Sequence, residues 1–384
     1  MVKIDIILPY KELFTSNGAS AVSISVKNSI KHSKNKKNIT VYGQYVEKPF
    51  SDLNFVGIKT KKFLHFGNNL SVIKQYLGKF NLEDSNRLIE LHNRPYLFNY
   101  LLNKKNKQCV ILYFHNDPLT MKGSKTKSQR LKILKEAAGV VFVSKFLRDK
   151  FLNGINESFD NTYVIPNSLD KNQKIALDKK LKNILFVGRI VKEKGVHIFI
   201  NAIKELSIKF SDWKFLLIGS SKLGYNNKTL YEKEIIKIAD KLGDNVEYHG
   251  YLSNEKVKDI MSKGSILVVP SIWEEPFGMT AIEGLSNKMS VISSDVGGLT
   301  EIVKDKGILI KDIDSTKLAN KIEYLIQSPA QIKKYQNLAW DNYSFDQKEI
   351  SNLQDKMREK IFNFFLILLN SVLKTKLKTL ICFQ

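Results

Sequence analysis

Cysteine and arginine are scarce in this chain, and no long hydrophobic run is present. Only two of the 384 residues are cysteine, Cys109 and Cys382, so neither a disulfide framework nor a cysteine-based metal site is expected. No segment reaches the ~18 consecutive apolar residues that a membrane-spanning helix needs. The apolar run at the start of the chain is short and Asp5 interrupts it, which does not fit a signal peptide. The composition predicts a protein that works in the cytoplasm.

The scarcity of arginine limits what the strong positive charge can mean. Lysine and arginine total 61 against 38 aspartates and glutamates, a net charge of +23, yet only six of the basic residues are arginine. Proteins that read nucleic-acid sequence favour arginine for its bidentate hydrogen bonds. No zinc-finger, helix-turn-helix or basic-aromatic module is present, so we expect no nucleic-acid partner. A solvated lysine-rich surface and attraction to anionic lipids or substrates both remain open.

Short β-branched runs alternate with helical patterns through most of the chain, which is typical of parallel α/β sheets. Helices are expected at 19–32 and 95–103, whereas residues 46–80 give no clear pattern. The expected strands are 4–8, 39–45, 88–91, 110–114, 140–143 and 163–165 in the first half, and 184–187, 214–218, 246–248, 266–269, 291–293 and 307–310 in the second.

The length favours two domains, and a polar, turn-forming stretch at 166–182 places the boundary between them. We expect a first domain over 1–168, a second over 169–345, and a crossover helix with an apolar and basic tail over 346–384. The second half predicts a doubly wound open sheet. Ligands bind such sheets outside the carboxyl ends of the strands, so informative residues are expected there.

The strongest motif follows the strand expected at 266–269. A loop containing Glu275 leads to a helix that begins near Gly278. The backbone N–H groups of Gly278, Met279 and Thr280 lack intrahelical partners and form a ready site for a diphosphate. Glu283, five residues into the helix, is placed to accept two hydrogen bonds from a ribose diol. The alternative is an ordinary helix start flanked by two solvated carboxylates.

Two cations follow the strand expected at 184–187. Arg189 stands directly after that strand, and Lys194 precedes a glycine that opens the next helix. Facing the Gly278 helix start, they would neutralise the negative charge that grows on a departing diphosphate. Either cation alone is more often solvated or salt-bridged.

The polar loop over 9–20 follows the first strand and leads into a helix through Gly18. Its amides could approach the same diphosphate from the first domain. A plain connecting loop, with Ser20 or Asn17 as the helix cap, is a nearly equal alternative.

Two histidines, His92 and His115, follow strands of the first domain, each beside an asparagine and near a proline. Two such histidines at strand ends favour a functional role over a purely structural one. Arg94 is a natural partner for an anionic acceptor or for a donor phosphate.

Other ligand motifs are weak or absent. No GxGxxG fingerprint is present, which disfavours nicotinamide chemistry. Asp312 and Asp314 spell the DxD of metal-dependent glycosyltransferases, but they precede an expected helix, so helix capping explains them better. We expect neither a metal nor a cofactor.

Together these residues resemble family 4 of the retaining glycosyltransferases, whose fold is GT-B. The resemblance covers roughly 1–350 and is strongest over 184–304. Glu275 and Glu283 match the family's E-x7-E motif, and residues 186–190 with 194–195 match its diphosphate-binding signature.

The resemblance implies a nucleoside-diphosphate sugar donor, bound between two Rossmann-like domains, and transfer that retains anomeric configuration without a metal. Arg189 and Lys194 would hold the diphosphate and Glu283 the ribose. Glu275 would contact the transferred sugar, and His115 would lie near the anomeric centre. Members of this kind often build envelope polysaccharide or lipopolysaccharide, so a glycan or lipid-linked acceptor is expected. A non-catalytic carbohydrate-binding subunit and a sugar-nucleotide epimerase are the alternatives.

The apolar segment 361–373 is followed by Lys374, Lys376 and Lys378. As a helix it would reach only ~20 Å and cannot cross a bilayer core. It is expected either to lie in the interface of an anionic membrane as a peripheral anchor or to pack on the protein. A disordered or swapped tail is the third alternative.

Overall fold

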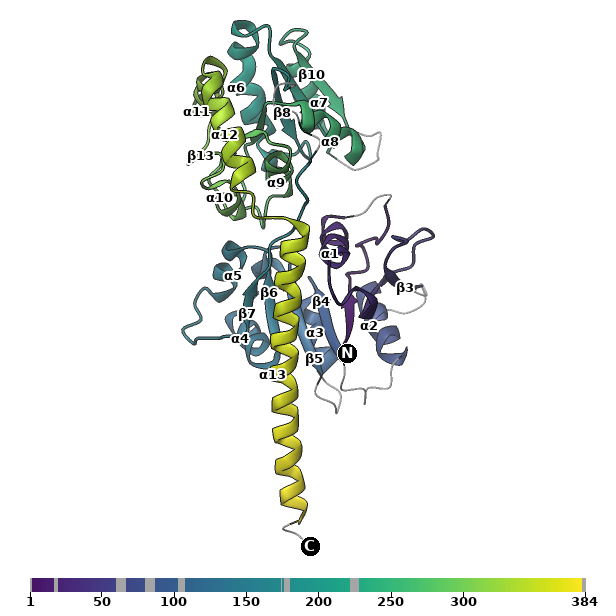
Figure 1. Ribbon diagram of the computed structural model, residues 1–384. Coiled ribbons are helices and arrows are strands. Elements are labelled where there is room, and N and C mark those ends of the chain that lie inside the picture. Colours follow the sequence, from purple (N-terminus) through teal and green to yellow (C-terminus); the bar gives the residue numbers. More distant parts are fainter. Residues whose placement is uncertain are drawn as a thin grey trace. The chain divides into compact units, whose positions relative to one another are not determined.

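The computed structural model describes residues 2–16, 20–59, 67–79, 87–102, 108–173, 175, 180–221 and 228–381, with side chains as far as 370 (Figure 1). The chain divides into two compact units. Unit 1 comprises Met1–Ser168 and Gln347–Gln384, and unit 2 comprises Leu169–Asp346.

The described part of unit 1 is built on a parallel sheet of order β3-β2-β1-β4-β5-β6-β7. Its strands are β1 (Lys3–Ile7), β2 (Ile39–Gln44), β3 (Asn54–Ile58), β4 (Arg87–His92), β5 (Cys109–Phe114), β6 (Gly139–Phe142) and β7 (Thr162–Val164). Its helices are α1 (Ala21–Lys31), α2 (Asn68–Lys79), α3 (Pro95–Leu102), α4 (Lys127–Glu136), α5 (Lys145–Leu152) and α13 (Gln347–Ile381), with short 3-10 turns η1 (Lys36–Asn38) and η2 (Pro118–Thr120).

The described part of unit 2 contains a second parallel sheet, of order β10-β9-β8-β11-β12-β13. Its strands are β8 (Asn183–Val187), β9 (Lys214–Ile218), β10 (Val246–Gly250), β11 (Ile266–Val269), β12 (Ser290–Ser294) and β13 (Ile308–Ile310). Its helices are η4 (Lys192–Lys194), α6 (Val196–Lys209), α7 (Leu230–Ala239), α8 (Asn254–Lys263), α9 (Met279–Ser286), α10 (Gly298–Val303), α11 (Ser315–Gln327) and α12 (Pro329–Asp341). The expected α/β class with two doubly wound sheets is confirmed.

Both strand orders reverse direction in the middle of the sheet. In unit 1 the switch lies between β1 and β4, and in unit 2 it lies between β8 and β11. In doubly wound sheets the loops after the strands at such a switch point diverge, which makes the carboxyl edge there the usual place for a ligand. Among the described residues, His92 is the last residue of β4 and His115 follows the neighbouring β5. The other described site candidates follow β4, β8 or β11.

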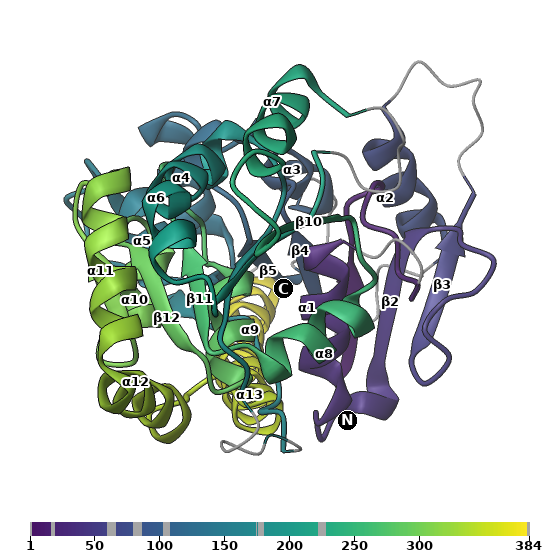
Figure 2. The same ribbon diagram turned by 90° about the horizontal axis from the view of Figure 1, so that it is seen from above.

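The expected strands agree with the observed ones to within two residues at each end. The unclear stretch 46–80 contains β3 and α2, which the pattern did not predict; Figure 2 shows β3 beside β2 at the edge of the unit 1 sheet. Asp314 caps α11 by accepting a hydrogen bond from the Lys317 N–H at 2.7 Å, as expected for helix capping.

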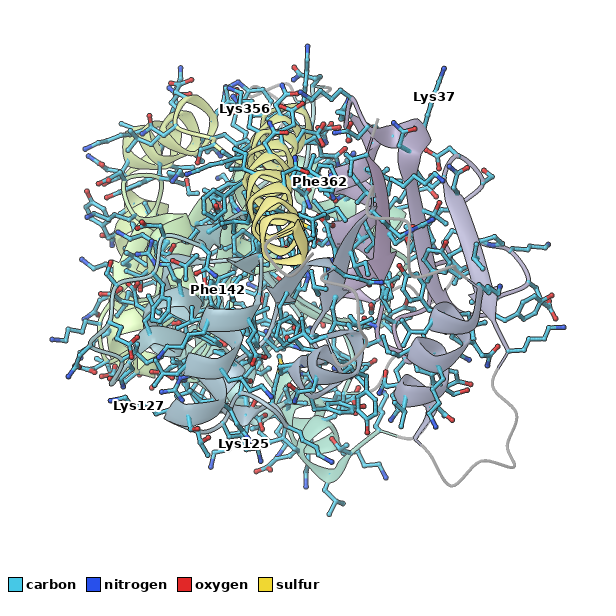
Figure 3. The ribbon with its side chains drawn as sticks, turned by 90° about the horizontal axis from the view of Figure 1, so that it is seen from below. Lys37, Lys125, Lys127, Phe142, Lys356 and Phe362 are labelled. Carbon is cyan, nitrogen blue, oxygen red and sulfur yellow. The ribbon has the colours of Figure 1, made fainter. Side chains whose placement is uncertain are left out.

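The helix α13 is longer than the sequence predicted. It runs unbroken from Gln347 to Ile381, so the apolar tail continues the crossover helix. Its first half packs on unit 1, where Ile350, Met357 and Phe362 join the buried core. Figure 3 labels Phe362 on this helix. In Figure 1 the second half extends beyond the rest of unit 1.

Candidate functional site

A glycine turn after β8 positions Lys194, one of the two cations predicted in unit 2. Gly195 has φ +69°, and a Cβ there would lie 1.8 Å from the carbonyl oxygen of Pro270, at the end of β11. Only glycine satisfies both conditions. The close approach brings Lys194, in the same turn, to the loop after β11, where its Nζ lies 2.5 Å from Oε1 of Glu275.

Replacing Gly195 with alanine is expected to lower the free energy of unfolding by more than about 3 kcal/mol, because the new methyl would collide with a backbone oxygen. Gly154→Ala is the matched control, since Gly154 has φ +76° with no atom within 4 Å of its Cβ position. That control should cost only about 1 kcal/mol, the strain of a left-handed alanine. Thermal unfolding of the two variants measures the difference, and equal losses would contradict the predicted collision.

Glu275 is held on both its side chain and its backbone. Its carboxylate accepts a hydrogen bond from the hydroxyl of Ser271 at 2.6 Å in addition to the Lys194 ion pair. Its carbonyl accepts from the Gly298 N–H at 2.7 Å, where Gly297 and Gly298 let the chain pass close to the loop. The pairing of Lys194 with Glu275, 81 residues apart, was not predicted from the sequence. The ion pair joins one of the two predicted phosphate-binding cations to the predicted sugar-contact residue.

The start of α9 leaves backbone donors free. Gly278 is its N-cap, at φ +123°, and it supplies no side-chain cap. Within the described residues the N–H groups of Met279 and Thr280 have no hydrogen-bond partner. By contrast, α7 and α8 are capped by the side chains of Thr229 and Ser253. Free amides and a helix dipole at a switch point form an anion site.

Glu283 lies in the second turn of α9 and is partly exposed. No hydrogen bond or ion pair of its carboxylate occurs among the residues that the structure describes. Burial raises its pKa to about 7. A partly buried carboxylate without a partner is suited to accept hydrogen bonds from a ligand, here the ribose hydroxyls that the sequence motif suggested.

Arg189 follows β8 directly and is exposed. Its guanidinium makes no ion pair with any side chain in the described part of the chain. The two cations of the sequence hypothesis therefore differ in environment: Lys194 is three-quarters buried and paired, whereas Arg189 is open to solvent.

In unit 1 the two histidines are in direct contact. Nδ1 of His92 lies 2.8 Å from Nε2 of His115, and the two rings are nearly parallel. His92 also stacks on Tyr113, with ring centroids 4.5 Å apart. Burial lowers the pKa of both imidazoles, that of His115 well below its ordinary value, so both are neutral at pH 7.

The residues between β4 and α3 hold His115 from the backbone side. Asn93 adopts a left-handed conformation, φ +51°, which asparagine tolerates. Its Oδ1 accepts a hydrogen bond from the His115 N–H at 2.7 Å. The guanidinium of Arg94 donates a hydrogen bond to the carbonyl oxygen of Asn93 at 2.6 Å. Burial raises the pKa of Glu12, in the loop after β1, and the positive charge of Arg94 offsets part of that rise. Gly18 of the same loop lies outside the described residues.

A buried ion pair next to the histidines was not predicted from the sequence. The guanidinium of Arg358, on α13, makes two hydrogen bonds to the carboxylate of Glu90, on β4, at 2.7 and 2.8 Å. Both side chains are almost fully buried. Burial alone would raise the pKa of Glu90, but the charge and hydrogen bonds of Arg358 lower it to about 2. Because the partners are 268 residues apart, no local motif signals the pair.

In the described ranges no three histidine, cysteine, aspartate or glutamate side chains gather closely enough to hold a metal ion. Asp312 has φ +45° in the turn before the Asp314 cap. The two aspartates are therefore explained by local backbone structure.

Known proteins match this chain over both units. Residues 167–343 match the family model of glycosyl transferases group 1. An uncharacterized glycosyltransferase of Methanocaldococcus jannaschii is 32% identical over 321 residues, which cover 80% of this chain and 85% of that protein. The lipopolysaccharide 1,2-N-acetylglucosaminetransferase of Salmonella typhimurium is 27% identical over 192 residues, 47% of this chain and 48% of that protein.

A solved structure identifies the fold. HepE from Anabaena, in complex with UDP and glucose, matches with a TM-score of 0.71 and 16% identity, covering 94% of this chain and all of that one. The fold class is therefore GT-B. The family-model match over residues 167–343 and the 32% identity to the Methanocaldococcus jannaschii glycosyltransferase together show that the chain belongs to the glycosyl transferases of group 1.

Proposed function

We propose that this enzyme is a retaining, metal-independent glycosyltransferase that moves a sugar from a nucleoside-diphosphate sugar to a hydroxyl acceptor. The observation that carries the proposal is the edge of unit 2 at β8 and β11. There the Lys194–Glu275 pair follows neighbouring strands, together with the amides of Met279 and Thr280 and the carboxylate of Glu283, which have no partner among the described residues. The solved complex of HepE with UDP and glucose supports a nucleotide-sugar donor.

Each group has a distinct part in the proposed reaction. The amides at the start of α9 bind the diphosphate, with Lys194 and Arg189 as its counter-charges. Glu283 accepts the ribose hydroxyls, and Glu275, oriented by Ser271, contacts the transferred sugar. As the sugar–phosphate bond breaks, its electron pair goes to the diphosphate. A diphosphate oxygen then takes the proton of the acceptor hydroxyl, which attacks on the same face and retains the configuration.

The test is a survey of sugar nucleotides, UDP-glucose first, with glycan and lipid-linked acceptors. Proton NMR of the product reports the anomeric configuration, and EDTA removes free divalent metal. We expect a product of unchanged configuration at an undiminished rate in EDTA. Inversion, or dependence on added metal, would overturn the proposal. Turnover of the donor without any acceptor would identify an epimerase, and donor binding without turnover would identify a binding subunit.

We propose an acceptor of the cell envelope, either a growing polysaccharide or a lipid-linked glycan. The support is the sequence match to the Salmonella lipopolysaccharide transferase. We further propose that the enzyme works on the cytoplasmic face of the membrane and associates with it peripherally through unit 1.

Charge and exposed apolar surface both support unit 1 as the membrane-facing part. Unit 1 holds 34 basic and 15 acidic residues, a net +19, whereas unit 2 holds 27 and 23, a net +4. Exposed lysines such as Lys37, Lys125 and Lys127 point outward from unit 1 (Figure 3). On α13, Phe364, Ile367 and Leu368 are 62%, 65% and 49% exposed.

The short apolar segment of α13 fits lying on a membrane better than crossing one. None of the described helices combines the length and the apolarity that crossing a bilayer requires. A helix with exposed apolar side chains and basic residues beside them binds in the interface of an anionic bilayer through apolar burial and lipid charge together.

Replacing Phe364, Ile367 and Leu368 with serine is expected to reduce binding to vesicles that contain phosphatidylglycerol at least tenfold, because each apolar side chain contributes about 1.5–3 kcal/mol when fully buried. Vesicle flotation measures the bound fraction. Ile208→Ser with Leu230→Ser is the control, since these unit 2 side chains are 79% and 86% exposed. Wild-type protein that does not float with anionic vesicles, or a triple variant that floats equally well, would contradict the proposal.

A further inference from the structure

Four buried polar side chains of unit 1 form one chain of contacts. It begins at Arg358 on α13, passes to Glu90 and His92 on β4, and ends at His115 after β5. Glu90 and His92 are two residues apart on one strand, so their side chains share a face of the sheet. The ends of the chain come from α13 and from the loop after β5, which are far apart in sequence.

The charge of Glu90 decides which nitrogen of His92 carries the proton. Oε2 of Glu90 lies 4.0 Å from Nε2 of His92, too far for a direct hydrogen bond but close enough for a strong field in a buried site. That nitrogen has no other partner among the described residues. A protonated Nε2 presents a positive N–H to the carboxylate, whereas a bare Nε2 would present a lone pair. The ionised Glu90 therefore favours the Nε2–H form of His92.

The tautomer of His92 then determines the tautomer of His115. With its proton on Nε2, His92 has an unprotonated Nδ1, which can only accept a hydrogen bond. Its partner at 2.8 Å, Nε2 of His115, must donate. A neutral His115 with its proton on Nε2 has a bare Nδ1. The hydrogen bonds of Arg358, and those that Tyr113 and Gln354 add beside Glu90, hold the carboxylate in place for this effect.

We propose that Arg358 and Glu90 are positioning residues that act through His92 to hold His115 in the Nε2–H tautomer, with Nδ1 as a hydrogen-bond acceptor. The role of this acceptor rests on the proposed function and on the expectation from the sequence resemblance that His115 lies near the anomeric centre of the donor sugar. Nδ1 of His115 is buried and has no partner in the described part of unit 1. It is therefore available to a sugar hydroxyl, which donates, and it rejects a group that can only accept, such as a fluorine in place of that hydroxyl.

The ion pair between Arg358 and Glu90 also gives α13 an electrostatic role in unit 1 besides its packing. The helix supplies the cation without which a buried Glu90 would not stay ionised. Asp355 on the same helix holds Arg358 from the other side at 3.2 Å and is itself bonded by Ser33. Docking of α13 on unit 1 and the tautomer of His115 are thus coupled.

The experiment uses the full chain labelled with ¹⁵N histidine, in which nitrogen chemical shifts separate bare from protonated ring nitrogens. His92→Gln and His115→Gln variants assign the signals. The test variant is Glu90→Gln with Arg358→Gln, which removes both charges but retains amide groups that can bond each other. Ser351→Ala is the matched control, since it removes a different hydrogen bond between α13 and unit 1, to the Ser29 carbonyl.

In the wild type and in Ser351→Ala we expect Nδ1 of His115 to give the signal of a bare nitrogen. In the double variant we expect that signal to shift toward a protonated nitrogen. The turnover number should then fall about threefold to tenfold, the worth of one hydrogen bond, with little change in the KM for the donor. A folded double variant with an unchanged His115 signal, or a wild type already protonated at Nδ1, would overturn the proposal. The NMR result needs no turnover, so a shifted signal in a protein without transfer activity would count against the proposed function alone.

Discussion

Removal of both Arg189 and Lys194, as a double alanine variant, is expected to reduce sugar transfer by about a thousandfold or more. The leaving diphosphate gains negative charge as the sugar departs, and a fixed group aimed at such charge is worth about 10²–10³ in turnover. The two cations follow β8, beside the strand whose loop leads to α9. Steady-state turnover with the donor found in the survey measures the loss, and calorimetry with the nucleoside diphosphate separates binding from chemistry.

The control must remove equal charge from the same region. Lys192→Ala with Lys204→Ala does so, because both lysines are exposed and lie in η4 and α6 on either side of Gly195. Its turnover should stay within about twofold of the wild type, as expected for exposed charges screened by salt. Near-normal turnover in the Arg189 and Lys194 double variant would refute the proposed diphosphate site. Equal losses in both double variants would show that net charge, rather than position, matters.

The sequence predicted strands well where they are buried on both faces. The strand β5 is buried at every position and reads as one continuous apolar run. The strand β3 was missed because it lies at the edge of the sheet, where four of its five residues are exposed or partly exposed, and because it contains Gly57. An edge strand has less need of apolar residues, so its pattern is weak.

The site was predictable where its residues are neighbours in sequence. The α9 start and Glu283 could be placed because a strand, a loop and a helix follow one another within a short segment. The ion pairs Lys194–Glu275 and Arg358–Glu90 could not, since they depend on how separate segments pack. For the same reason the sequence did not show that His92 and His115 touch.

The sequence alone left three alternatives for the tail: a membrane anchor, a segment packed on the protein, and a disordered or swapped end. The structure shows that Ile361 and Phe362 are buried against unit 1, whereas Phe364 and Ile367 are mostly exposed. A segment that is apolar on all sides cannot reveal which side a neighbour covers. Only the packed structure separates the two halves of this helix.

The affinity for the sugar nucleotide is expected to rise with pH by up to about tenfold per unit below pH 7 and to level off above it. Burial raises the pKa of Glu283 to about 7. Below pH 7, therefore, Glu283 is protonated in much of the enzyme that has no donor bound. Ribose hydroxyls donate best to the ionised form, so binding lowers this pKa and releases a proton. Calorimetry in buffers of different ionisation enthalpy measures both the affinity and the proton release. A sugar nucleotide suits the test because its diphosphate does not titrate in this range.

Glu283→Gln is the matched control, since glutamine keeps the shape but has no titrating group. Its affinity should be lower than that of the wild type at pH 8 and should not vary with pH, and its binding should release no proton. A wild-type affinity that is flat between pH 5.5 and 8 would contradict a ribose contact to the ionised carboxylate. A slope that persists in Glu283→Gln would assign the titration to another group.

Glu283→Gln should weaken donor binding but stabilise the folded protein. The pKa of Glu283 in the folded free enzyme lies above the ordinary value of 4.5. The unfolded chain therefore loses its proton first, and the folded state loses stability as the pH rises from about 4.5 to 7. Glu283→Gln removes this loss, so the free variant should unfold at a higher temperature than the wild type at pH 8 while binding the donor more weakly. Opposite effects on stability and binding are characteristic of a group whose unfavourable burial serves its ligand.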